Sequence, residues 1–403
     1  MRTTIDLLMQ QAGCLGWPER WRDIYDAAMD DFDRNGCPLT DPAYYDALAA
    51  EYGVLEVELD TYKQAAAEVG GSEVLSRVLH LLVTALQQEE FNKPDTTAFK
   101  LPYPPKSEPW LGRDMLGGLA LCSQIPRCAR RLRQRKLPED IILDALRRPL
   151  HIDVYRDHHN GLPGNDLLDW HQFSIAGELF PMGRLDLQYN YPFTGTAKVF
   201  RNKSGDIVAL AHDLPVHRSG IALGARGFED EDGSWQADVT QTDSDWIGYP
   251  FGPDGLVQKK PVHLAKNEWE LVLQKGDTVI QLHIPGGSKL DMDAVSESIQ
   301  RMRDFTSAYY PEYKYKAFAC ASWMLNPKLA DLLGEHSNIV KFGRLFHPLT
   351  MKIHGTGVFY FVFMQPGYEC DVAALPTNTR LEKALKEYYL SGNFLHETNG
   401  YFF

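Results

Sequence analysis

The first 150 residues follow a helical pattern of apolar and polar positions. Apolar residues recur at spacings of three and four in the segments 23–29, 44–52, 73–86, 111–121 and 138–146. Such spacing is typical of helices that bury one face. The segment 91–108 is polar and rich in proline, and it predicts a loop. We therefore predict an all-α N-terminal domain over residues 1–150.

From about residue 168 the pattern changes to short strands. Alternating or continuous apolar runs predict strands at 170–180, 182–189, 197–200, 206–212, 269–273, 278–284, 315–325 and 357–364. Helical patterns follow at 291–310, 327–334 and 379–390. The predicted fold class is thus α+β, with a mixed α/β domain over residues 151–403 after the all-α domain.

Composition and charge narrow the class of protein. The chain has 403 residues, 44% of them hydrophobic, and a net charge of −13. This charge argues against binding to nucleic acid and to anionic membranes, because both need a basic face. No run of 18 apolar residues occurs, and the first residues lack the long apolar core of a signal peptide. The six cysteines are scattered without a C-x-x-C pair, so we expect reduced thiols, no metal site and a cytoplasmic protein.

A glycine turn between a predicted strand and a predicted helix is the strongest chemical signal. The strand 278–284 ends at Pro285, Gly286 and Gly287, and Asp291 can cap the helix that follows. Such a turn can offer backbone amides to an anion such as the pyrophosphate of a nucleotide or of coenzyme A. The alternative is a tight turn that binds nothing, because glycine also serves steric needs alone.

Longer stretches of the chain resemble a bacterial family of N-acyltransferases. These stretches are 137–146, 177–186, 283–288, 296–305, 310–313, 321–329 and 337–342. Members of that family join a helical N-terminal domain to a C-terminal domain similar to the GCN5-related acetyltransferases (GNAT). The resemblance implies a GNAT-like fold. It also implies transfer of an acyl group from acetyl-CoA or another acyl-CoA to an amine of a small molecule or peptide.

The resemblance also points to a coenzyme A site in the glycine turn. Against the acetyltransferase loop pattern Arg/Gln-x-x-Gly-x-Gly/Ala, His283 stands at the first position, Gly286 at the first glycine and Ser288 at the small residue. The amides of Gly286, Gly287 and Ser288 would hold the pyrophosphate, with Lys289 nearby. Pro285 removes one possible donor.

Three residues are candidates for proton transfer in such a reaction. Glu178 lies among apolar residues, where burial would raise its pKa and make it a base; the alternative is a strand glutamate paired with Arg184. His283 is a candidate base or phosphate contact, or else a packed strand histidine. Ser322 could protonate the leaving thiolate if strands 278–284 and 317–323 are adjacent, or it could cap the next turn.

Substrate-binding candidates are Arg184, Trp323 and Asn338, and for Asn338 an Asx turn is the alternative. The run 127–136 holds six basic residues, which suit a solvated helix face better than an anion site. The segment 157–160 contains two adjacent histidines, which suit a polar loop better than a metal site.

Two other functions stay open at this point. One is a non-catalytic GNAT-like protein that binds a metabolite or a carbohydrate through its eight tryptophans and nineteen tyrosines. The other is a hydrolase with Ser322 or Cys320 as the nucleophile, which requires a histidine partner. The sequence leaves the oligomeric state open.

Overall fold

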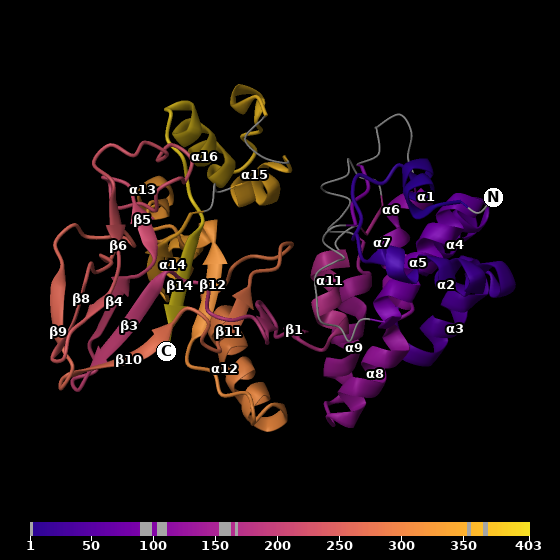
Figure 1. Ribbon diagram of the computed structural model, residues 1–403, viewed down its shortest axis with the longest axis horizontal. Helices are drawn as coiled ribbons and strands as arrows, with labels where there is room; N and C mark the ends of the chain where they lie inside the picture. The colour runs from indigo at the N-terminus through magenta and orange to yellow at the C-terminus, as the bar shows by residue number, and fades with distance from the viewer. Residues whose placement is uncertain are drawn as a thin grey trace. The chain divides into compact units, whose positions relative to one another are not determined.

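The computed structural model describes residues 3–88, 99–102, 111–152, 163–165, 168–352, 356–365 and 370–403. The chain divides into two compact units, Met1–Pro181 and Met182–Phe403 (Figure 1). The sequence pattern predicts this boundary at residue 150. The segment 157–160 and most of the segment 91–108 lie outside the described residues.

The first unit is helical, which confirms the all-α prediction. Its helices are α1 (Ile5–Ala12), α2 (Trp21–Asn35), α3 (Pro42–Tyr52), α4 (Leu59–Gly70), α5 (Glu73–Gln88), α6 (Leu111–Asp114), α7 (Leu116–Cys122), α8 (Ile125–Gln134), α9 (Glu139–Arg147) and α11 (Leu168–Ile175). The 3₁₀ turns η1 (Pro38–Thr40) and η3 (Arg148–Leu150) and the strand β1 (Leu179–Pro181) complete it. Among the described helices no single one is long and apolar enough to span a membrane. Helices α4 and α5, which meet at a bend of 115°, are long and apolar enough only when they are taken together.

The predicted strand at 170–180 is wrong over its first half, which forms helix α11. Gly177 ends this region with a positive φ of 71°, and the amide of Glu178 donates to the carbonyl of Phe173 at 2.9 Å. A left-handed glycine with this back-bonded amide is a common helix terminus. Only Leu179–Pro181 is extended. The short apolar run fitted either conformation, and burial of Leu168 and Ile175 accompanies the helix.

The second unit is built on a mixed sheet, which confirms the predicted α+β class. The order of its strands is β2 (Asp186–Gln188), β11 (Ile280–His283), β12 (Phe318–Ser322), β14 (Thr398–Phe402) and β13 (His347–Thr350). Strands β11 and β12 run parallel, and the other neighbours are antiparallel. The sheet therefore has one parallel pair, β11 and β12, with an antiparallel neighbour on either side; both strands are labelled in Figure 1.

The two faces of this sheet are covered differently. Helix α12 (Met292–Tyr309) lies on one face, where Arg303 stacks over the ring of Phe318 at 4.8 Å and Tyr189 shares a hydrogen bond of 2.7 Å with Thr306. On the other face Ala319 and Tyr401 join a core cluster with a small antiparallel sheet. That sheet has the order β10 (Trp269–Gln274), β3 (Ala197–Asn202) and β4 (Ile207–Ala211).

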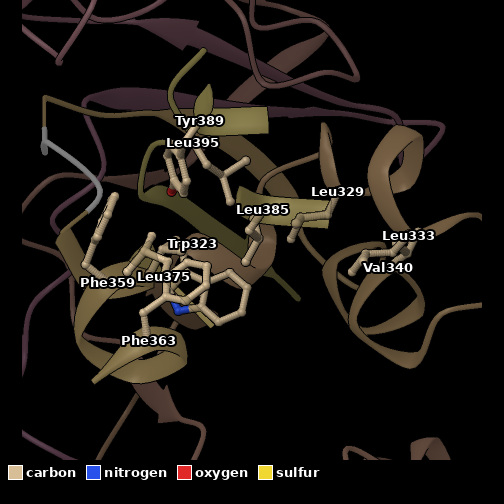
Figure 2. Close-up of a cluster of buried hydrophobic side chains, with 11 residues drawn as sticks. Trp323, Leu329, Leu333, Val340, Phe359, Phe363, Leu375, Leu385, Tyr389 and Leu395 are labelled. Atoms are coloured by element: carbon tan, nitrogen blue, oxygen red, sulfur yellow. The ribbon is translucent and has the colours of Figure 1, made fainter. Parts of the chain in front are cut away.

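Further elements surround this framework. They are β5 (Leu214–Val216), β6 (Trp235–Ala237), β7 (Thr240–Gln241), β8 (Asp245–Gly248), β9 (Val262–Ala265), η4 (Trp323–Leu325), α13 (Leu329–Leu333), α14 (Asn338–Gly343), α15 (Thr356–Phe363), η5 (Val372–Ala374) and α16 (Arg380–Leu390). The predicted strand at 357–364 is therefore wrong, because this segment is helix α15. Its aromatic, β-branched composition favours a strand locally. The helix instead packs Phe359 and Phe363 into an apolar cluster with α13 and α16 (Figure 2).

Candidate functional site

The parallel strands β11 and β12 pair over two positions and then separate. Ile280 faces Phe318 and Gln281 faces Ala319, and the described ladder between these strands ends there. Both strands continue, β11 to His283 beside β2 and β12 to Ser322 beside β14. The adjacency on which the suggested role of Ser322 depends is therefore present. We call the region beyond this ladder, between the carboxyl ends of the two parallel strands, the opening; such a region is the usual place for a ligand in sheets of this kind.

The glycine turn lies at the end of β11 and presents its backbone to solvent. Residues 286–289 are exposed, and a side-chain carbon added at Gly286 or Gly287 would meet no atom within 4 Å. Gly287 has a φ of 84°, a conformation that favours glycine. None of the amides of residues 286–289 donates a hydrogen bond within the described part of the chain. We call residues 285–289 the glycine loop.

The start of helix α12 is already capped from within. The side chain of Asp291 accepts hydrogen bonds of 3.1 Å from the amides of Asp293 and Ala294. This confirms the predicted cap and satisfies two amides of the first helical turn. The amides of the glycine loop are available to an anion, with the exposed side chain of Lys289 beside them.

Arg184 holds the glycine loop from the turn that precedes β2. Its guanidinium donates to the carbonyls of Pro285 at 3.0 Å, Ser288 at 3.2 Å and Lys289 at 2.9 Å. Burial lowers the pKa of Arg184, although Asp186 opposes this effect. Arg184 is predicted from the sequence to bind substrate or to pair with Glu178, and in the structure its guanidinium donates to carbonyls of the glycine loop.

A buried polar strip runs beside the opening, and three of its four residues were not predicted. Asp186, Gln188, Gln281 and His283 share one face of the sheet, since side chains alternate along strands and opposed residues point the same way. Exposed fractions are 2% for Asp186, 1% for Gln188 and 6% for Gln281. In the sequence these polar residues alternate with Leu187 and Leu282. Such alternation ordinarily indicates a strand with one face in solvent, so it does not reveal that these residues are buried. We call these four residues the polar strip.

His283 is the member of the polar strip closest in sequence to the glycine loop. Its Nε2 lies 2.7 Å from Oε1 of Gln188, so Nε2–H donates to the amide oxygen and Nδ1 carries the lone pair. Burial lowers the pKa of His283 from 6.5 to about 4. The imidazole is therefore neutral at physiological pH.

On the other side of the opening, Ser322 ends strand β12. Its Oγ accepts a hydrogen bond of 3.1 Å from the amide of Met324, so the predicted turn cap is present. The cap uses a lone pair of the hydroxyl oxygen, and the O–H can still donate elsewhere. The next residue, Trp323, is 6% exposed and packs in the apolar cluster of Figure 2, so its ring serves the core.

The cysteine of β12 has the properties of a structural thiol. Cys320 is 2% exposed, and burial raises the pKa of its thiol to about 12. In the described chain, neither Cys320 nor Ser322 is hydrogen-bonded to a histidine. A nucleophilic hydrolase needs such a partner, so this geometry does not favour that alternative.

Glu397 is a further carboxylate at this edge that the sequence analysis missed. It directly precedes Thr398, which pairs with Ser322. Burial raises the pKa of Glu397, while hydrogen bonds from the amides of Trp323 and Gly357 oppose that rise. The carboxylate thereby joins the start of η4 to the start of α15. No motif marks Glu397, because its partners are far away in the sequence.

Two further candidates are Glu178 and Asn338. Glu178 belongs to the first unit, where it follows the terminus of α11 and precedes β1, and is not the strand glutamate expected. Asn338 is the first residue of α14 and is exposed. Its side chain makes no hydrogen bond to a described residue, so the Asx turn is not formed there.

Comparison with known proteins agrees with this architecture. A family model described as the GNAT-like C-terminal domain matches residues 179–402. The chain belongs to this family. The family predicted from the sequence is thus confirmed for the GNAT-like unit. No curated protein matches the chain.

Solved structures extend the likeness of this GNAT-like chain to its helical unit. Three crystal structures of acyltransferases each cover 98% of both chains at 17% identity. One contains decanoyl-CoA and teicoplanin (TM-score 0.61), one contains CoA and 10C-teicoplanin (TM-score 0.61), and a variant contains octanoyl-CoA (TM-score 0.60). At this level of identity the likeness concerns the fold.

Proposed function

We propose that this protein is an N-acyltransferase that moves an acyl group from acyl-CoA to an amine. The observation that carries the proposal is the glycine loop, whose amides face solvent at the end of β11 beside the separated strands. Membership of the GNAT-like family supports it. The acyl-CoA and CoA complexes of proteins with the same fold support it further.

Coenzyme A would use two features of the opening. Its pyrophosphate would accept hydrogen bonds from the amides of Gly286, Gly287 and Ser288, with the charge of Lys289 nearby. Its pantetheine arm carries amides, which can pair with the strand edge that β11 exposes beyond Gln281. This arrangement would bring the thioester to the carboxyl ends of β11 and β12.

The proposed reaction forms a C–N bond and breaks a C–S bond. The neutral amine attacks the thioester carbonyl, and the resulting ammonium loses a proton to Nδ1 of His283. A weak base suffices here, because the nitrogen becomes far more acidic once it is bonded to the acyl carbon. The hydroxyl of Ser322 would donate to the leaving sulfur. Holding both substrates in place supplies much of the rate in such a transfer.

We infer a small-molecule acceptor. The carboxamides of Gln188 and Gln281 and the carboxylate of Asp186 can orient a polar amine beside His283. The side chain of Gln281 makes no hydrogen bond to a described residue, so it can bind such a group. Of the structures that share this fold, one is a complex with teicoplanin and another a complex with 10C-teicoplanin.

Calorimetric titration with coenzyme A and acetyl-CoA tests the proposal. Gly286→Asp places a negative charge in open space on the loop, so the protein should still fold while the affinity for coenzyme A falls at least about tenfold. Gly286→Asn has nearly the same shape without the charge and should lose much less. Absence of binding to folded wild-type protein refutes the acyltransferase and favours the non-catalytic alternative.

A further inference from the structure

The turn that carries Arg184 is anchored to helix α12. The amide of Arg184 donates to Oγ of Ser298 at 2.9 Å, and that hydroxyl donates to the carbonyl of Ala294 at 2.7 Å. Ser298 is 1% exposed, so this anchor is excluded from water. Gly183 before it has a φ of 96°, with its α-carbon facing Ser298. The backbone of Arg184 therefore has a fixed position relative to the helix that follows the glycine loop.

The three guanidinium hydrogen bonds determine which way the loop amides point. In a trans peptide unit the carbonyl of one residue and the amide of the next point in opposite directions. Because the carbonyls of Pro285 and Ser288 point to Arg184, the amides of Gly286 and Lys289 point away from it. The carbonyl of Lys289 is held in the same way.

Little else in the described chain fixes the glycine loop. Its amides donate no hydrogen bonds, and Gly286 and Gly287 have open space around their α-carbons. Two adjacent glycines have more backbone freedom than any other pair of residues. The loop would lose its amide orientation if the guanidinium were removed.

We propose that Arg184 is a positioning residue that holds the glycine loop with its amides turned toward the pyrophosphate of acyl-CoA, without itself serving as the phosphate's charge partner. This inference rests on the proposed function. The planar guanidinium has several donors in a fixed fork, and it matches three carbonyls at once. A lysine has the same charge on a single nitrogen and cannot make this set of contacts.

The test compares Arg184→Lys, Arg184→Met and Arg301→Met. Arg301 is the matched control, because it is an exposed arginine on α12 beside Gly183 and makes no hydrogen bond to the glycine loop in the described chain. Backbone ¹⁵N order parameters of residues 286–290, measured by NMR relaxation, and calorimetric titration with coenzyme A are compared among the folded variants. Circular dichroism and the unfolding midpoint establish that each variant is folded.

We expect both Arg184 variants to lower the backbone order parameters of the loop amides and to bind coenzyme A at least about tenfold more weakly than wild type. Arg301→Met should match wild type in both measurements. If Arg184→Lys binds like wild type, Arg184 acts through its charge and the inference is overturned. Unchanged order parameters in both Arg184 variants overturn it as well. If wild type binds no coenzyme A while the variants still have lower order parameters, the proposed function fails and the loop-holding role survives.

Discussion

Acidification should destabilise this protein because it protonates His283, and replacing His283 should remove this part of the destabilisation. Burial lowers the pKa of His283 from 6.5 to about 4. The folded protein therefore disfavours the protonated imidazole, whereas the unfolded chain accepts the proton readily. The stability that depends on the neutral ring is fully present above pH 6.5 and is lost as the pH falls from 6.5 to about 4.

The size of this effect follows from the same pKa values. Each pKa unit corresponds to about 1.4 kcal/mol, so the histidine accounts for a loss of about 3 kcal/mol between neutral pH and pH 4. His283→Gln keeps a side-chain donor for Gln188 and cannot be protonated. Its stability should fall less over this interval, by up to about 3 kcal/mol.

Urea unfolding of wild type and His283→Gln at pH 7 and pH 4, followed by tryptophan fluorescence, measures the difference. A histidine NMR titration that compares the two proteins identifies the His283 signal and gives its pKa directly. Parallel loss of stability in both proteins, or a His283 pKa near 6.5, would refute the reasoning that burial keeps the ring neutral. If the pKa of His283 is near 6.5, the rate of the proposed acyl transfer should also change with pH near 6.5.

Three further predictions follow from other buried groups. Burial raises the pKa of Glu397, so wild type should lose stability relative to Glu397→Gln as the pH rises from 4 to 7. If the difference in urea midpoint between the two proteins is the same at pH 4 and pH 7, this prediction is wrong. The Cys320 thiol, with its pKa raised to about 12, should resist iodoacetamide at pH 8 until the protein unfolds, and peptide mass spectrometry should detect its modification only in denaturant. Tyr189→Phe removes the buried hydrogen bond of 2.7 Å to Thr306 and should cost about 1 kcal/mol in urea unfolding, while an unchanged midpoint would show that the bond contributes nothing net.

Local signals in the sequence predicted most of the elements that position the site. The strand at 278–284, the glycine turn and the helix at 291–310 appear in the structure as β11, the glycine loop and α12, with Asp291 as the cap. Thr379 likewise caps α16. These signals act over a few residues, since periodic burial, caps and backbone freedom are properties of short segments.

Local preference does not predict the structure where tertiary packing competes with it. Residues 357–364 have strand-forming side chains, yet helix α15 buries Phe359 and Phe363 in a cluster with residues of α13 and α16. The alternation of polar residues in β2 and β11 is typical of an exposed face, whereas the structure buries that face as the polar strip. Burial depends on which segments pack on a strand, and the sequence of the strand alone does not show which segments these are.

The sequence by itself determined the helical first unit, the mixed second unit and the glycine loop with its capped helix. Only the tertiary structure decided that Arg184 holds this loop, that Gln188 orients His283, and that Glu397 joins two helix starts. The contacts of Arg184 cross 101 to 105 residues, and that of Gln188 crosses 95. Such pairings form when the sheet closes around its core, because sheet register and packing bring together residues that no local pattern connects.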